Sequence, residues 1–123
     1  MAIKKKKKEI PEFNIKQRFD NVKTLFTTNR PKEAISYIYR AYNALIENNF
    51  QKPRLPHQTI REYAMICVNE LNQNPESVYK FVRKIEDIIY GGVEPTKKEI
   101  EDAIGLFSKL YQEITNKTFQ FTL

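Results

Sequence analysis

The chain of 123 residues contains one cysteine, one histidine, three glycines and no tryptophan. A single cysteine cannot form a disulfide within the chain, and one Cys with one His does not supply a zinc site. No apolar run approaches the roughly 20 residues of a membrane span. The first residues lack both the apolar segment of a secretory signal and the glycine needed for myristoylation. We therefore expect a cytoplasmic protein without metal, cofactor or membrane span.

Basic residues outnumber acidic ones by 21 to 15, and the excess is uneven along the chain. Residues 1–13 carry five lysines and two glutamates, a net charge of +3, whereas residues 14–123 carry sixteen basic and thirteen acidic groups, also +3. The lysines are consecutive: Lys4, Lys5, Lys6, Lys7 and Lys8. Five adjacent ammonium groups repel one another and bury nothing, so residues 1–13 are predicted to form a flexible arm that orders only against negative charge.

A second basic segment contains Lys52, Arg54, His57 and Arg61, with no acidic residue before Glu62. Two interpretations of both basic segments stay open. They are solvated surface features, or they are the footprint of a polyanion whose counterions are released on binding.

Apolar residues recur at spacings of three and four along most of the chain, which predicts amphipathic helices. The first spans about residues 15–28 after Asn14 as N-cap, and the second about residues 31–47, with Pro31 in its first turn and Asn48 and Asn49 ending it. The residues of the second helix that are expected to face inward are Ala34, Ile35, Ile38, Tyr39, Ala41, Tyr42, Leu45 and Ile46.

Capping signals place three further helices. Thr59 with Glu62 and Thr96 with Glu99 have the spacing of a capping box, and Asn74 followed by Pro75 is an N-cap with a first-turn proline. Between the second and third helices, Pro53 and Pro56 predict an irregular connector.

Two glycines carry predictions of their own. Gly91 is expected to take the left-handed conformation that ends the fourth helix, and Gly105 to allow close packing of the fifth.

The expected fold is a compact all-α bundle of about five helices over residues 14–116, preceded by the basic arm. Residues 117–123 form an extended tail in which Phe119, Phe121 and Leu123 alternate with polar residues. We expect this tail to pack on its own bundle, although it could also lie along the edge strand of a partner.

Four sequence blocks resemble a family known as a domain of unknown function. They are Asn29–Ile35 running into Tyr39–Ala41, then Pro56–Tyr63, then Ile89–Gly92, then Thr96–Ala103. That family forms the cytosolic C-terminal helical domain of membrane proteins encoded near transglutaminase-like proteins and MoxR-type ATPases. The resemblance implies a helical fold and a role at a membrane complex but no catalytic residues. It departs here in that members usually place a membrane span before the domain, where this chain has its lysines.

Candidates for catalysis are few. Cys67 falls on an inner helix face and is interpreted as a core residue, and His57 lies in a proline-bounded loop without a visible second group. Gly91–Gly92 lacks the preceding strand of a phosphate-binding loop. Most aromatic residues fall on inner faces, while Phe13 and Phe50 beside the basic segments stay open as base-stacking residues. The sequence therefore does not predict an enzyme.

The sequence instead predicts a non-catalytic helical binding module that contacts a polyanion, nucleic acid first. The residues expected to neutralise phosphates are Lys4, Lys5, Lys6, Lys7, Lys8, Lys52, Arg54 and Arg61. The alternative is an adaptor for a protein partner with no role for nucleic acid. The sequence does not decide whether two copies associate through an exposed helix face, or whether an anionic membrane surface is the polyanion.

Overall fold

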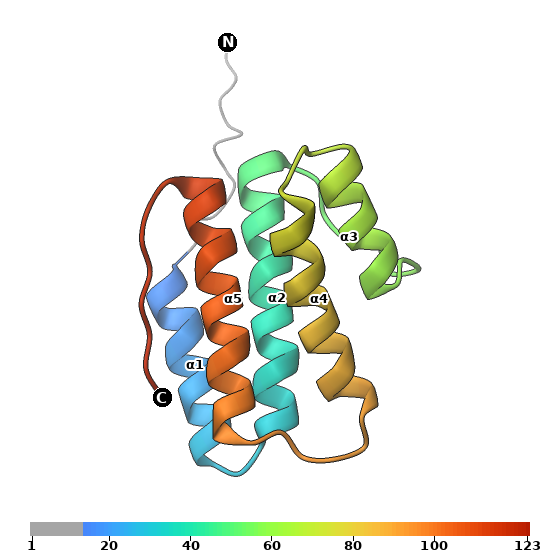
Figure 1. Ribbon diagram of the computed structural model, residues 1–123. Coiled ribbons are helices and arrows are strands. Elements are labelled where there is room, and N and C mark those ends of the chain that lie inside the picture. Colours follow the sequence, from blue (N-terminus) through green and yellow to red (C-terminus); the bar gives the residue numbers. More distant parts are fainter. Residues whose placement is uncertain (1–13) are drawn as a thin grey trace.

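The computed structural model describes residues 14–123, which form five helices and no strand. The helices are α1 (Ile15–Thr27), α2 (Pro31–Phe50), α3 (Ile60–Asn69), α4 (Pro75–Tyr90) and α5 (Lys97–Thr115). This confirms the predicted all-α class, and all five predicted helices are present (Figure 1).

The helix starts follow the predicted caps. Thr59 and Thr96 each accept a hydrogen bond from the backbone N–H of the glutamate three residues on, and each glutamate bonds back to the N–H of its threonine. Asn14 accepts from Gln17 N at 3.0 Å. Each cap satisfies backbone donors that the first helical turn leaves without partners, which fixes where the helix begins.

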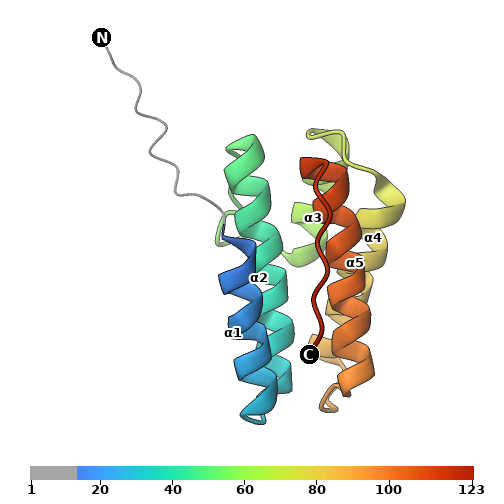
Figure 2. The same cartoon turned by 90° about the vertical axis from the view of Figure 1, so that its left-hand side faces the viewer.

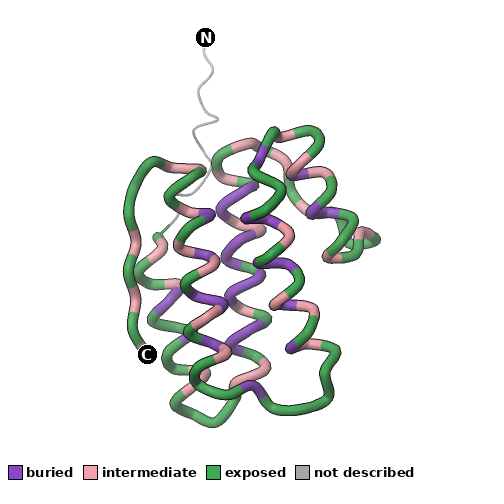
Figure 3. Tube along the Cα trace, in the orientation of Figure 1, coloured by how far each residue is buried: buried purple, intermediate pink, exposed green. Residues whose placement is uncertain are grey.

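α2 is the central helix of the bundle, with α1, α4 and α5 all packed beside it. The eight residues predicted to face inward on α2 are its eight buried residues. Figure 3 shows this burial running along the length of the helix. α3 is the shortest helix, and its backbone lies beside α4 alone at the edge of the bundle (Figure 1).

The tail after α5 runs back along the bundle, and its apolar residues pack against the core (Figure 2). The Phe119 ring lies 4.8 Å from that of Phe19 on α1 and 6.2 Å from that of Phe107 on α5, centroid to centroid. Ser108 donates a hydrogen bond to the carbonyl oxygen of Phe119. The backbones of α1 and α5 make no close approach to each other within the described chain, so the tail fills the seam between them.

Some expectations were wrong. α2 continues past Asn48 and Asn49 to Phe50, because Phe50 packs against the core and the chain turns only at Gln51, which has a φ of 53°. The apolar spacing from Ile60 onward also predicts that Leu71 belongs to the third helix, but α3 ends at Asn69 and Leu71 lies in the following turn.

Both glycine predictions also fail. Gly91 is right-handed with a φ of −75°, and Gly92 has the left-handed φ of 76°. Gly105 is exposed, and a Cβ atom there would meet nothing within 4 Å, so Gly105 does not serve close helix packing.

Candidate functional site

The lysine arm, with Lys4, Lys5, Lys6, Lys7 and Lys8, lies outside the described residues. The first described residue is Asn14, the N-cap of α1. The five lysines therefore precede α1 in the chain. A ligand that binds them can also contact the residues around the amino-terminal end of α1.

Two cations of the second basic segment, Lys52 in the connector and Arg61 on α3, face carboxylates from elsewhere in the chain. Lys52 Nζ lies 3.4 Å from Glu70 Oε1, just beyond the end of α3, and Arg61 Nη2 lies 2.6 Å from Glu86 Oε1 on α4. The local positive charge that the sequence shows is therefore matched in space by acidic groups. Solvent screens ion pairs at the surface and leaves them weak, so a dense polyanion can compete for both cations.

Arg54 is half-buried and shapes the connector. Its Nη1 donates to the carbonyl oxygen of Gln58 at 2.6 Å and to that of Leu55 at 3.3 Å. The Gln58 side chain in turn accepts from Leu55 N at 2.7 Å. These bonds hold residues 54–58, which include Pro56, in one shape and so give Arg54 a structural role.

The two candidate nucleophile and base residues lie in different environments. Cys67 is buried on the inner face of α3, and burial raises the pKa of its thiol, which keeps it protonated. His57 is exposed in the connector and has no hydrogen-bond or ionic partner among residues 14–123. Within that range, no group of three or more His, Cys, Asp or Glu side chains is arranged to hold a metal ion.

The net positive charge of the described chain belongs to the α1–α2 hairpin, which we define as residues 14–50. The hairpin has six basic residues and three acidic ones, a net charge of +3, whereas residues 51–123 have ten of each and are neutral. The hairpin cations are Lys16, Arg18, Lys23, Arg30, Lys32 and Arg40. The two segments that carry the excess positive charge, the arm and the hairpin, therefore follow each other directly in the chain.

Ion pairing divides the molecule in the same way. Of the ion pairs between described residues, only Arg30 with Glu33, at 3.8 Å, lies in the hairpin, and the others join residues beyond 51. No described carboxylate lies within 4 Å of the side-chain nitrogens of Lys16, Lys23, Lys32 and Arg40. These cations are available to an anionic ligand without breaking an ion pair within the described chain.

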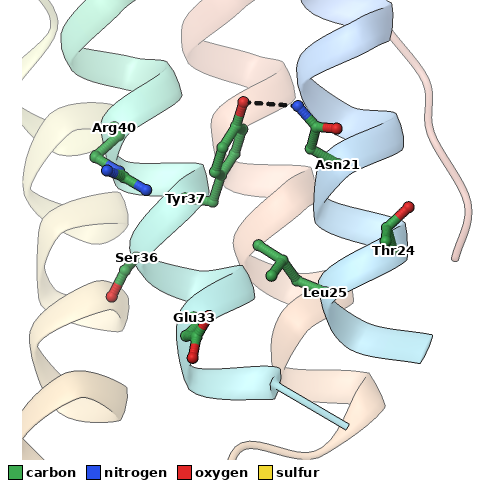
Figure 4. A pocket seen from close by; sticks show the side chains of 7 residues that line it. All are labelled: Asn21, Thr24, Leu25, Glu33, Ser36, Tyr37 and Arg40. Carbon is green, nitrogen blue, oxygen red and sulfur yellow. Dashed lines mark hydrogen bonds between the residues drawn. The ribbon is translucent and has the colours of Figure 1, made fainter. Parts of the chain in front are cut away.

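A groove of about 350 Å³ runs between α1 and α2 on the outer face of the hairpin (Figure 4). It is lined by Asn21, Thr24, Leu25, Glu33, Ser36, Tyr37 and Arg40. Asn21 Nδ2 donates to the Tyr37 hydroxyl at 2.9 Å, which joins the two helices across the groove. The guanidinium carbon of Arg40 lies 5.5 Å from the centroid of the Tyr37 ring, at the distance of a cation–π contact.

A second hollow of about 260 Å³ adjoins this groove toward the start of α1. Asn14, Gln17 and Arg18 line it together with Asn21 and Tyr37, which both hollows share. The concave surface of the hairpin therefore extends to the residue at which the arm is attached.

Comparisons with known protein families, with curated proteins and with solved structures gave no match. The resemblance to the family of cytosolic helical domains rests on its four sequence blocks and stays a prediction. Within residues 14–123, no helix combines the length and the apolar character needed to cross a bilayer.

Sequence reasoning missed the hairpin groove, above all Asn21, Tyr37 and Arg40. The charge signal was present, because dividing residues 14–123 at Phe50 separates a basic half from a neutral one. The groove itself depends on how α1 crosses α2, which the sequence does not show. The sequence overestimated the free positive charge of the second basic segment. The carboxylates that pair with Lys52 and Arg61, on Glu70 and Glu86, are 18 and 25 residues away in the sequence.

Proposed function

We propose that this chain is a non-catalytic helical module that binds nucleic acid through the lysine arm and the α1–α2 hairpin. The observation that carries the proposal is the segregation of charge: the whole net charge of +6 falls within residues 1–50. In this proposal Lys52 and Arg54 of the connector and Arg61 of α3 assist only where their internal partners are displaced.

The physical basis is release of counterions. Each lysine or arginine that neutralises a phosphate frees a condensed cation, which favours binding and makes it weaken as salt increases. Cations without a carboxylate partner among residues 14–123, such as Lys16 and Lys23, release counterions without the loss of an ion pair within that range. Cations already matched by carboxylates, such as Arg61, contribute less.

The test measures the affinity of the full chain for single-stranded and duplex DNA over a series of salt concentrations. Two variants remove the same charge from different places: K16Q/K23Q/K32Q from the hairpin, and K97Q/K109Q/K117Q from the neutral half. We expect the hairpin variant to bind at least tenfold more weakly and to lower the salt slope for single strands by up to about 2, because each lost phosphate contact removes about 0.7. The control variant should stay within about twofold of the unaltered chain.

Other outcomes contradict the proposal in different ways. Equal losses in both variants would show a response to net charge alone. Affinity that changes neither with salt nor with removal of residues 1–9 would exclude the phosphate-binding role. Tighter binding to vesicles containing phosphatidylserine than to nucleic acid would identify a membrane surface as the polyanion.

One observation favours the adaptor as a second candidate. Tyr90 and Val93 are 74% and 75% exposed on either side of Gly91–Gly92. Tyr90 belongs to the Ile89–Gly92 block that resembles the family of cytosolic helical domains, and Val93 follows that block directly. A protein partner that covers both side chains would bury apolar surface that now faces water. This candidate predicts a stoichiometric protein partner that survives nuclease and high salt and is lost in the Y90A/V93S variant.

A further inference from the structure

The α1–α2 groove combines, in one concave place, an aromatic ring, a guanidinium that has no carboxylate partner among residues 14–123, and hydrogen-bonding groups (Figure 4). Its volume of about 350 Å³ lies at the lower end of the range of about 300 to 1,000 Å³ typical of sites for small molecules.

The Tyr37 ring and Arg40 together make a platform for a planar group. Bases of single strands stack on aromatic rings and on guanidinium planes, and such stacking tolerates any base because every base has a π face. The hydrogen bond from Asn21 fixes the Tyr37 hydroxyl, and the ring is therefore held in place before a ligand arrives. A preorganised ring loses less conformational freedom on binding.

The charged groups of the groove lie at its two ends. Arg40 and Glu33 are seven residues apart on α2, which separates them by about 10 Å along the helix axis. A phosphate is attracted to Arg40 and repelled by Glu33, whereas an amino group on a base edge can donate to Glu33. Ser36, between them, adds a hydroxyl that can donate or accept.

Resting on the proposed function, we propose that this groove holds one unpaired nucleotide of a single strand. Its base packs against Tyr37 and Arg40, and its phosphate lies at the Arg40 side. The strand continues past Asn14 toward the lysine arm. A duplex keeps its bases stacked inside and reaches only the cations of the hairpin, so the groove gives a preference for single strands.

The experiment compares the full chain with Y37L, Y37F and R40Q for binding to a labelled 12-nucleotide single strand and to a duplex of the same length. Y37L removes the ring and keeps apolar bulk, whereas Y37F keeps the ring and removes the hydroxyl. Matched controls are Y90L and R83Q, which alter an exposed tyrosine and an exposed arginine of α4. Circular dichroism and a thermal melt establish that each variant is folded.

We expect Y37L to weaken binding of the single strand about tenfold and binding of the duplex less than twofold. R40Q should weaken both, the single strand more, while Y37F, Y90L and R83Q stay within about threefold of the unaltered chain. A photoreactive 4-thiouridine strand should cross-link to the peptide that contains Tyr37, which reports the contact without any variant.

Three results would overturn the inference. If Y37L binds the single strand like Y90L, while affinity still depends on salt and on the arm, the groove is not a base site and the proposed function stands. If mononucleotides bind as tightly as the 12-nucleotide strand, the ligand is a free nucleotide. If the unaltered chain shows no salt-dependent affinity for any nucleic acid, the proposed function and the groove site fail together.

Discussion

Gly105 occupies the outer face of α5, although it stands between Ile104 and Phe107 of the inner stripe. With 100° of rotation per residue, the position after Ile104 already points away from the core, so helical periodicity could have predicted its exposure. Gly91 differs: its φ of −75° suits any residue, yet a Cβ atom there would lie 2.5 Å from the carbonyl oxygen of Asp87. The close approach between the Gly91 backbone and the Asp87 carbonyl oxygen could not be predicted from a sequence pattern.

The two glycines should therefore respond to alanine with opposite signs. Gly105→Ala removes backbone freedom from the unfolded chain at an unobstructed helical site and should raise the free energy of unfolding by about 0.5 to 1 kcal/mol. Gly91→Ala forces the end of α4 to shift and should lower it by about 1 to 3 kcal/mol. Urea denaturation of both variants measures these changes, and a destabilised Gly105→Ala would contradict the open environment described for α5.

At the scale of whole elements, helix positions were predictable because capping and periodicity are local. Thr59 and Thr96 fix two helix starts through residues three positions away, and the eight inward positions of α2 follow from spacing alone. The end of α2 was not predictable from Asn48 and Asn49, because Phe50 gains more from packing against residues distant in sequence than the chain gains from turning early. Local sequence also did not show that Lys52 and Arg61 are paired, because their acidic partners, Glu70 and Glu86, are distant in sequence.

The tail offers an element-scale prediction. Phe119 covers Phe19, which has no exposed surface, and lies beside Phe107 and Tyr111 of α5. Phe119→Ala should lower the free energy of unfolding by about 2 kcal/mol, less than for a fully enclosed ring because Phe119 is half-buried. The exposed neighbour Gln120→Ala serves as the control and should change it by less than about 0.5 kcal/mol. Denaturation of both variants in urea provides the measurement, and equal effects would mean that the tail does not close the seam.

For the whole molecule, the response to alkaline pH follows from the buried phenols. Burial raises the pKa of Tyr39, Tyr42 and Tyr63 above their ordinary value of 10.0, because the phenolate would lose its hydration. The unfolded chain releases these protons at lower pH than the folded chain does. The stability that comes from keeping them neutral is therefore complete below about pH 10 and is lost as the pH rises above it.

We expect the free energy of unfolding to fall steeply above about pH 10, by up to about 1.4 kcal/mol per pH unit for each buried tyrosine. Urea titrations at several pH values measure the slope, and absorbance of tyrosinate reports the ionisation. Tyr42→Phe should reduce the slope by one such contribution, although it also removes the hydrogen bond to Gln73. Complete ionisation of all seven tyrosines while circular dichroism still reports intact helices would contradict the burial.

The peripheral position of α3 has a consequence for how the molecule opens. Detaching this helix from α4 disrupts fewer interactions than unfolding the bundle. Local opening at α3 should therefore need less free energy than opening of any other helix. The single thiol of the chain, on Cys67, lies on its hidden side. An alkylating reagent would therefore reach the sulfur only while α3 is detached. The rate at which Cys67 is labelled should then report how often this local opening occurs.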